Sequence, residues 1–316
     1  MKTAVDIGGA TIPNPVMTAS GTFGYGEEYA GLCDITRLGA VVTKGITLEP
    51  SGGNPPPRGC ETAAGMLNAI GLQNVGVEAF IADKLPYLRE RGVACVVNIQ
   101  GGTIEEFVAV ARKLTGCDGV TALELNVSCP NKAGGLSFGT DPAALRGLVA
   151  AVRKATPLPL MTKLSPNVGD ITECARAAVE GGSDSLSLLN TLIGMAVELG
   201  DPARGIKPSP ILHNVTGGLS GPAIKPVALR MVWETARAVK VPVIGIGGIA
   251  TATDALEFLA VGASAVQVGT ANFYNPRACE EILDGITAFM TDHAIPDINQ
   301  FIGTLDIPRD RGFSAR

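Results

Sequence analysis

The sequence predicts an α/β protein that folds as a single (β/α)8 TIM barrel over residues 1–316, with an N-terminal β-hairpin and long βα loops over the active site. Its length of 316 residues suits one such barrel, which usually takes about 250 residues plus insertions. The composition is 46% hydrophobic with 40 Gly and 21 Pro, as expected for many short buried strands joined by tight turns. Apolar runs alternate with amphipathic stretches along the chain, and this alternation indicates βα units and a parallel sheet.

The first predicted element is a β-hairpin over Val5–Ile12, in which Gly8 and Gly9 separate two short apolar stretches; we expect it to close the bottom of the barrel. Short runs of β-branched or other apolar residues then predict eight barrel strands: Val16–Ala19, Ala40–Thr43, Cys95–Ile99, Ala122–Asn126, Leu160–Leu164, Ser185–Leu189, Val243–Ile246 and Ala265–Val268. Apolar residues at three- and four-residue spacing predict the helices between them: Val75–Arg91, Ile104–Thr115, Pro142–Ala155, Ile171–Gly181, Lys225–Val239 and Thr253–Val261.

Three of the connections that follow predicted strands are long. They are Lys44–Asn74, Val127–Asp141 and Asn190–Ile224. In a barrel of this kind the active site is built from the loops at the C-terminal ends of the strands. We therefore expect the functional residues to lie in these three connections and at the strand ends beside them.

Composition and charge exclude several classes of function. The net charge of −5 and the lack of a Lys/Arg run argue against a nucleic-acid partner. No apolar run approaches the roughly 18 residues that span a bilayer, and the opening residues lack a signal-peptide pattern, so a soluble cytoplasmic protein is expected. The seven Cys include no C-x-x-C pair, and no His/Asp/Glu cluster suggests a metal.

The sharpest motif is Asn126-Val127-Ser128-Cys129-Pro130-Asn131, which begins at the end of the fourth predicted strand. A lone Cys is usually an inert small hydrophobe, and the surrounding string is what argues otherwise for Cys129. A thiol has a reference pKa of about 8.5, close to working pH, so its thiolate can accept a weakly acidic proton alpha to a carbonyl.

This string resembles the catalytic loop of class 1 dihydroorotate dehydrogenases, in which the Cys is the general base, whereas class 2 enzymes place a Ser there. The resemblance covers nearly the whole chain, and the strings Phe23–Tyr29, Met66–Asn74 and Gly217–Pro226 are most similar to class 1B. It implies that Cys129 removes a proton from carbon 5 of dihydroorotate while hydride leaves carbon 6 for FMN. The implied product is orotate, an intermediate of pyrimidine biosynthesis.

The resemblance also implies a substrate pocket. A Lys that ends a buried strand points into the barrel mouth, where a cation suits a carboxylate substrate. Asn side chains offer both a donor and an acceptor, so three of them at strand ends could match the edges of a pyrimidine. The implied substrate contacts are Lys44, Asn68 with the backbone of Ala69, Ile70, Gly71 and Leu72, and Asn126, Asn190 and Thr191.

The flavin site has marks of its own. Gly-rich turns follow the seventh and eighth strands, where such barrels bind phosphate through backbone amides, although this signal does not tell one phosphate ligand from another. Lys163 ends the fifth strand and resembles the family Lys whose charge would stabilise a reduced flavin. The implied FMN contacts are Ser20, Gly21, Lys44, Gly45, Asn98, Asn126, Lys163, Leu189, Gly221, Gly247, Gly248, Gly269 and Thr270.

Class 1B resemblance implies NAD as the final electron acceptor, yet the chain has no G-x-G-x-x-G in a Rossmann unit and no clustered Cys for an iron–sulfur relay. The missing parts are therefore expected on another chain. The resemblance implies that this other chain is an electron-transfer subunit carrying FAD and a [2Fe–2S] cluster, in a heterotetramer of two catalytic and two electron-transfer chains.

The sequence leaves other classes of enzyme open. They are a class 1A fumarate-dependent enzyme, a dihydropyrimidine dehydrogenase-like barrel, which usually carries His in place of Asn131, and a non-redox phosphate-binding lyase or isomerase. Class 2 is disfavoured by Cys129. Two features depart from the family pattern: Gln100 stands where a small residue is expected, and Met195–Ser209 is longer than the matching stretch. His213 and His293 match no catalytic position.

Overall fold

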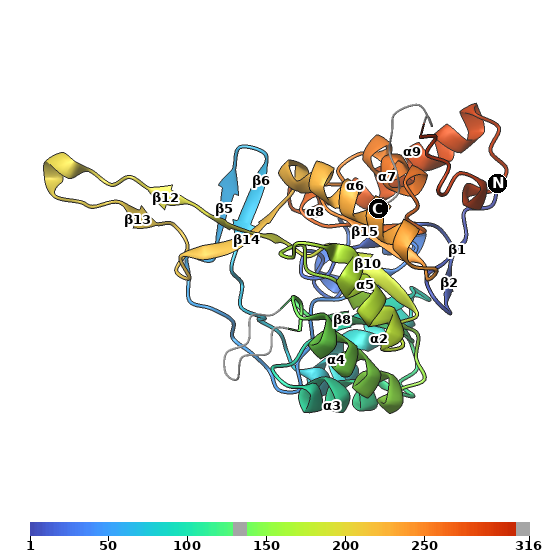
Figure 1. Ribbon diagram of the computed structural model, residues 1–316, viewed down its shortest axis with the longest axis horizontal. Coiled ribbons are helices and arrows are strands. Elements are labelled where there is room, and N and C mark those ends of the chain that lie inside the picture. Colours follow the sequence, from blue (N-terminus) through green and yellow to red (C-terminus); the bar gives the residue numbers. More distant parts are fainter. Residues whose placement is uncertain (129–137, 308–316) are drawn as a thin grey trace.

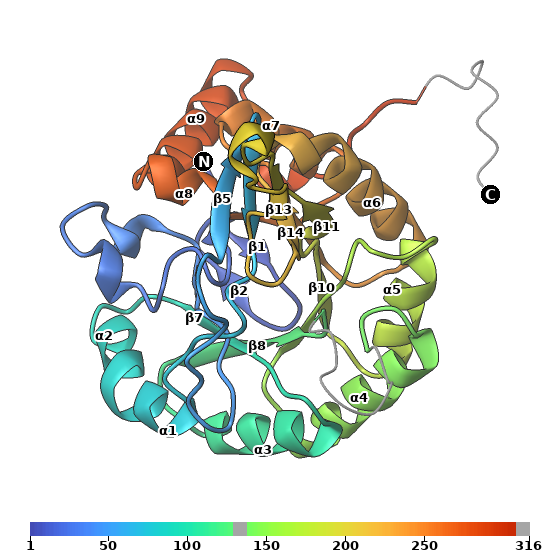
Figure 2. The same ribbon diagram turned by 90° about the vertical axis from the view of Figure 1, so that its left-hand side faces the viewer.

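The computed structural model describes residues 1–128 and 138–307, and its largest unit is an eight-stranded parallel barrel ringed by helices (Figure 1, Figure 2). Adjacent strands pair in the order β3-β16-β15-β10-β9-β8-β7-β4. A parallel bridge between Met17 and Ala40 joins the two ends of this sheet and closes it. The strands are β3 (Val16–Thr18), β4 (Val41–Val42), β7 (Cys95–Ile99), β8 (Val120–Asn126), β9 (Leu160–Lys163), β10 (Ser185–Leu188), β15 (Val243–Ile246) and β16 (Ala265–Val268). The predicted (β/α)8 barrel is confirmed.

The barrel strands are buried along nearly their whole length, because helices cover the outer face and side chains fill the interior. Most of the buried side chains are apolar, which explains why the strands read as short continuous apolar runs. A small set of buried side chains is polar and forms hydrogen bonds or an ion pair across strands inside the barrel. These residues are Asn98, Glu124, Lys163, Ser187 and Gln267.

The helices form around the barrel and begin at ordinary capping residues. Asp141 accepts hydrogen bonds from the backbone N–H groups of Ala143 and Ala144, and Thr251 forms a capping box with Asp254. None of the helices in the described ranges is both long and apolar enough to cross a membrane. The main helices are α3 (Ile104–Leu114), α4 (Pro142–Ala155), α5 (Ile171–Glu180), α6 (Lys225–Ala238), α7 (Ala252–Ala260) and α9 (Ala278–Asp292), with the short α8 (Ala271–Tyr274) before the last.

The helix predicted over Val75–Arg91 is divided in the structure. It consists of α1 (Val77–Ala79), a π-helical turn η3 (Phe80–Lys84) and α2 (Leu85–Arg89). Pro86 has no N–H to donate and its ring disfavours a regular helix through the preceding turn, which explains a wider turn at this place.

The sequence pattern did not predict α9. Gly285 lies in the middle of this helix and weakens its helical signal. The structure shows why a glycine is present: a Cβ at this position would come within 2.3 Å of the Ala252 Cβ in α7. Close packing of α7 against α9 therefore decides the residue, at a cost in helix propensity.

The predicted N-terminal hairpin is present as β1 (Val5–Asp6) and β2 (Thr11–Ile12), which pair antiparallel. Gly8 has a φ of +95°, and a Cβ there would lie 2.4 Å from the Asp184 carbonyl oxygen, just before β10 begins. The hairpin therefore covers the N-terminal ends of the strands, which is the bottom of the barrel as predicted.

The long connections after β4 and β10 form a second sheet over the opposite end of the barrel (Figure 2). Its antiparallel order is β11-β14-β6-β5, with β5 (Gly59–Thr62), β6 (Gly65–Asn68), β11 (Leu192–Met195) and β14 (Thr216–Ser220). The sequence predicted these segments as loops because β14 begins Thr-Gly-Gly, which has little strand propensity. Gly218 is needed in β14, since a Cβ there would lie 1.9 Å from the Thr191 Oγ1.

A narrow antiparallel ribbon extends from this sheet away from the barrel (Figure 1). It contains β12 (Val197–Glu198) and β13 (Ser209–Pro210), with a short 3-10 turn at Pro202–Arg204. The ribbon accounts for the long stretch Met195–Ser209. Several of its apolar side chains are exposed, namely Met195, Val197, Leu199 and Ile206.

Candidate active site

The C-terminal ends of β8 and β10 bring two of the predicted asparagines into contact. The Asn190 side-chain N–H donates to the Asn126 Oδ1 across 3.1 Å. The Asn190 Oδ1 in turn accepts from the Thr191 backbone N–H at 2.9 Å, which fixes the orientation of this amide. Because its oxygen is occupied by Asn190, Asn126 can turn its own side-chain N–H groups toward a ligand.

Asn68 lies at the end of β6 in the second sheet, and its side-chain N–H donates to the Gly218 carbonyl at 3.4 Å. Asn167, which the sequence did not single out, donates to the Thr191 carbonyl at 3.1 Å and accepts from the Ile193 backbone N–H at 3.0 Å. It joins the end of β9 to the start of β11 and so holds the Asn190–Thr191 turn in place. Its signal was present in the sequence as a further strand-end asparagine.

Lys44 follows β4, and its backbone N–H donates to the Gly24 carbonyl at 2.8 Å. Its side chain is half-buried, and within the described ranges it forms no ion pair. Burial lowers the pKa of the Lys44 ammonium below the ordinary lysine value, and the nearby Arg58 lowers it further. A half-buried cation without a bound acid is suited to an anionic ligand.

Lys163 ends β9 and is almost fully buried. Its ammonium donates to the Ser20 Oγ at 3.1 Å, which joins it to the connection after β3. It also lies 3.8 Å from the Glu124 Oε1 in the barrel interior. Two predicted contacts, Ser20 and Lys163, are therefore brought together from distant parts of the chain.

Asn98 and Gln100 lie side by side beneath Gly45. A Cβ on Gly45 would be 2.8 Å from the Asn98 Oδ1 and 2.8 Å from the Gln100 Nε2. The Asn98 Oδ1 and the Gln100 Oε1 are buried acceptors that have no hydrogen-bond partner in the described part of the chain. Unsatisfied buried acceptors are costly, so both oxygens are suited to donors on a bound ligand. Gln100, which stands where the family pattern has a small residue, is thus a buried polar side chain beside the predicted flavin contacts Gly45 and Asn98.

The Gly-rich strand ends also meet. Gly248 has a φ of +72°, and a Cβ there would lie 2.8 Å from the Gly221 carbonyl oxygen. Thr270 shares a hydrogen bond of 2.9 Å with the Ser220 Oγ. Such close backbone approach demands glycine and leaves amide groups free to face an anion. The other predicted members of this group occupy the neighbouring strand ends, namely Gly21, Leu189, Gly247 and Gly269.

The remaining predicted residues are placed as follows. Ala69 donates its backbone N–H to the Arg58 carbonyl, and Ile70 accepts from the Asn54 backbone N–H. Gly71 and Leu72 have positive φ values of 74° and 64°, which turn the chain back toward Asn74. Cys129 lies outside the described residues, so its predicted role stays a prediction.

The two histidines lie away from these residues. The His213 backbone N–H donates to the Pro57 carbonyl near the base of the ribbon. His293 directly follows α9, and its Nδ1 is 2.9 Å from the Phe289 carbonyl oxygen. Neither contact involves a predicted site residue. Within residues 1–128 and 138–307 no group of three or more His, Cys, Asp or Glu residues is placed to hold a metal ion.

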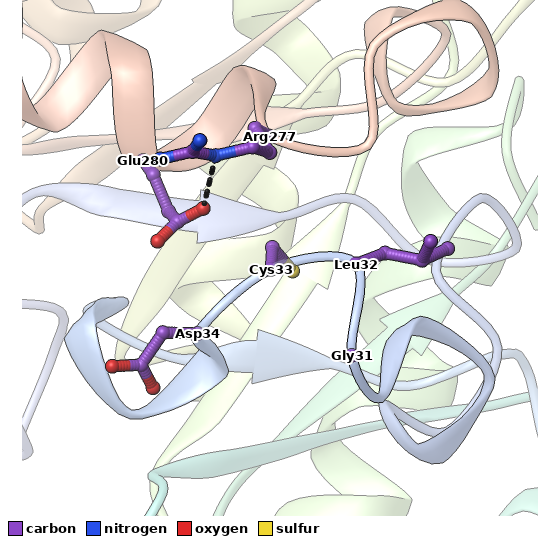
Figure 3. A pocket seen from close by; sticks show the side chains of 6 residues that line it. All are labelled: Gly31, Leu32, Cys33, Asp34, Arg277 and Glu280. Carbon is purple, nitrogen blue, oxygen red and sulfur yellow. Dashed lines mark hydrogen bonds and ion pairs between the residues drawn. The ribbon is translucent and has the colours of Figure 1, made fainter.

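A separate surface pocket of about 340 Å³ lies between the connection that follows β3 and the start of α9 (Figure 3). Its polar wall is an ion pair between Arg277 and Glu280, 3.2 Å apart. The Cys33 thiol lines the same pocket, and burial raises its pKa to about 11, so it is protonated near neutral pH. None of the predicted substrate or flavin contacts lines this pocket.

The barrel mouth therefore combines paired asparagines, a half-buried and a buried lysine, unsatisfied acceptors and closely packed glycines. This arrangement is typical of a barrel enzyme and is suited to an anionic ligand and a phosphate-bearing group. A family model described as dihydroorotate dehydrogenase matches residues 2–290. The chain belongs to the dihydroorotate dehydrogenase family, whose members are flavin-dependent oxidoreductases.

Curated relatives match over nearly their whole length. A protein of Geotalea uraniireducens is 56% identical over 96% of this chain and 97% of its own. One of Geobacter sulfurreducens is 55% identical, with 96% and 98% covered, and one of Thermoanaerobacter sp. strain X514 is 53% identical, with 97% and 100% covered. All three are named "Dihydroorotate dehydrogenase B (NAD(+)), catalytic subunit".

Proposed function

We propose that this chain is the catalytic subunit of an NAD-dependent dihydroorotate dehydrogenase, which oxidises dihydroorotate to orotate in pyrimidine biosynthesis with FMN as the hydride acceptor. The observation that carries the proposal is the Asn126–Asn190 pair at the barrel mouth, in a chain whose relatives with that name are 53–56% identical. These relatives also favour the NAD-dependent class over the fumarate-dependent one.

The residues at the mouth suit recognition of a pyrimidine carboxylate. The ring edge of such a substrate alternates N–H and C=O groups, and the Asn126 amide, oriented by Asn190, offers donors to it. Asn68 approaches from the second sheet, so the pocket is completed by two different sheets. Lys44 supplies the cation for the carboxylate, and its depressed pKa reflects the burial that strengthens such a contact.

The structure also fits FMN. The buried Asn98 Oδ1 and Gln100 Oε1 offer acceptors beside Gly45, and Lys163 places a positive charge at the end of β9. Gly221, Gly248 and the neighbouring strand ends can receive a phosphate on backbone amides. Bound FMN would supply a hydride acceptor, while the protein orients it and excludes water.

Cys129 is the proposed general base. In the sequence it follows Ser128 and lies three residues after Asn126, which ends β8 and pairs with Asn190. A thiolate there would remove the proton from carbon 5, and Lys44 and the asparagines would hold the ring still during this transfer.

Electrons must leave through another chain. This sequence has no Rossmann G-x-G-x-x-G unit, and its cysteines are not clustered. We therefore propose an electron-transfer subunit with FAD and a [2Fe–2S] cluster, in a heterotetramer of two catalytic and two electron-transfer chains. The names of the relatives, which specify a catalytic subunit and NAD(+), support this division.

The test is to purify the chain alone and with its partner. Heat should release FMN from the chain alone, which should pass electrons from dihydroorotate to an artificial dye but not appreciably to NAD. Adding the partner should restore NAD reduction. A colourless protein, or one that releases only FAD, would refute the flavin assignment, and partner-independent turnover with fumarate would move the protein to class 1A.

A further inference from the structure

Glu124 is a carboxylate with no exposed surface in the interior of the barrel. Its neighbours come from four other strands, and each presents a donor. The Asn98 Nδ2 donates to the Oε1 at 2.6 Å, and the Ser187 Oγ and Gln267 Nε2 donate to the Oε2 at 2.8 and 2.7 Å. The Lys163 ammonium lies 3.8 Å from the Oε1.

Two of these neighbours extend from Glu124 to the cofactor site. Lys163 donates to the Ser20 Oγ in the connection after β3, and Asn98 faces Gly45 after β4. Burying a carboxylate is costly, and apolar residues of similar volume can replace many buried ion pairs without loss of stability. A role confined to packing therefore does not account for a charged group at the meeting point of two predicted flavin contacts.

The chemistry of a carboxylate also determines how Asn98 is oriented. An ionised carboxylate only accepts hydrogen bonds, so Asn98 must turn its NH2 group toward Glu124. Its Oδ1 then faces Gly45, where it is buried and without a partner among the described residues. An acceptor presented in this way suits an imide N–H, the group that the pyrimidine edge of an oxidised flavin offers.

Glu124 also offsets the charge of Lys163. A lysine beside the flavin stabilises the reduced, anionic form of the ring, and a carboxylate 3.8 Å behind that lysine weakens this effect. The same carboxylate is the counter-charge of the Lys163 ammonium in the nearly fully buried interior.

We propose that Glu124 is a positioning residue for the cofactor: it orients the Asn98 amide as an acceptor and balances the Lys163 charge, and so sets the affinity and reduction potential of the bound flavin. The inference rests on the proposed function, since it assumes that the mouth binds FMN. Glu124 itself is separated from the mouth by Asn98 and Lys163 and is not a catalytic residue.

The first test is Glu124→Gln, which keeps the shape of the side chain and removes its charge. We expect the two-electron reduction equilibrium of the bound flavin to shift toward the reduced form by at least tenfold, a rise of about 30 mV. The apoprotein should bind FMN at least threefold more weakly, because a Gln can present an N–H to Asn98 and allow that amide to flip. Ser187→Ala is the matched control: it removes one hydrogen bond to the same carboxylate and should leave the potential unchanged.

A double variant keeps the test decisive if Glu124→Gln does not fold. Lys163→Met alone should shift the reduction equilibrium of the bound flavin toward the oxidised form by at least tenfold. The double variant Lys163→Met with Glu124→Gln removes both charges, and its flavin reduction equilibrium should lie within threefold of the wild-type value. Equal potentials for the single Lys163 variant and the double variant would overturn the inference, as would a folded Glu124→Gln protein with unchanged potential and FMN affinity. Wild-type protein that binds no FMN would overturn the proposed function, and the inference with it.

Discussion

Asn190, at the end of β10, donates its side-chain N–H to the Asn126 Oδ1 at the end of β8, and this 3.1 Å contact determines which groups the barrel mouth offers to a ligand. The two residues are 64 positions apart in the chain. Each would be an ordinary strand-end asparagine by itself, whereas the pair presents the Asn126 donors in a fixed direction.

Replacing Asn190 with alanine should weaken orotate binding without preventing folding. The Asn126 amide would lose its fixed orientation, and one polar contact would be missing from the pocket. Because a hydrogen bond contributes about 0.5–1.5 kcal/mol, we expect orotate affinity to fall about threefold to tenfold. Orotate titration of the flavin spectrum measures this change. Asn299→Ala, in the turn that bonds to Ala4 at the other end of the barrel, should leave the affinity unchanged.

Replacing Cys129 with alanine should retain FMN and orotate binding while nearly abolishing reduction of the flavin by dihydroorotate. A positioned base contributes about 10²–10⁴-fold to a proton transfer, and this factor is the expected loss in single-turnover flavin reduction. Cys129→Ser should keep a little activity that rises with pH, because a hydroxyl is a much weaker acid than a thiol. An alanine variant within a few-fold of the wild type would remove Cys129 from the mechanism.

Orotate binding should weaken as the pH rises, and the loss should begin at a lower pH than it would if Lys44 had an ordinary lysine pKa. Burial depresses the pKa of Lys44, so the free enzyme loses this cation as the pH rises through a value below the usual lysine range. The affinity should therefore be complete on the acid side of that pKa and fall on its alkaline side. Lys44→Arg keeps its charge over this range and should move the alkaline limb upward, since all other titrating groups are shared. Identical pH profiles for the two proteins would contradict the assignment.

Replacing Gly248 with alanine should disturb the proposed phosphate site, where the backbones of Gly221 and Gly248 approach each other closely. Gly248 has a φ of +72°, and its new Cβ would lie 2.8 Å from the Gly221 carbonyl oxygen. We expect a loss of about 1–2 kcal/mol in the free energy of unfolding and at least a tenfold weaker FMN affinity. Gly147→Ala is the control: this exposed position in α4 has no atom within 4 Å of a new Cβ, and alanine should stabilise the helix by about 0.5–1 kcal/mol. Equal FMN affinity in the two variants would argue against a phosphate site at Gly221 and Gly248.

Local patterns in the sequence determined the barrel and the strand ends of the site. The eight apolar runs are readable because a parallel strand buried on both sides must be apolar at nearly every position, as in β7 and β16. The same logic located Lys44, Asn126 and Lys163, since a polar residue at the C-terminal end of such a run lies at the barrel mouth. The identity of the family came from motifs in the connections.

Only the tertiary structure decided how these residues combine. The second sheet pairs β6 with β14, about 150 residues away in the chain, and its Gly-Gly segment carries no strand signal of its own. The sequence pattern also did not predict α9, because Gly285 weakens its helical signal. This glycine is required by the close packing of Ala252 in α7, which no local pattern shows. Glu124 reads as one acid within a strand, and its role depends on donors that Asn98, Lys163 and Gln267 bring from three other strands. Such contacts arise from barrel closure, which places side chains together irrespective of their separation in the sequence, and no local pattern encodes them.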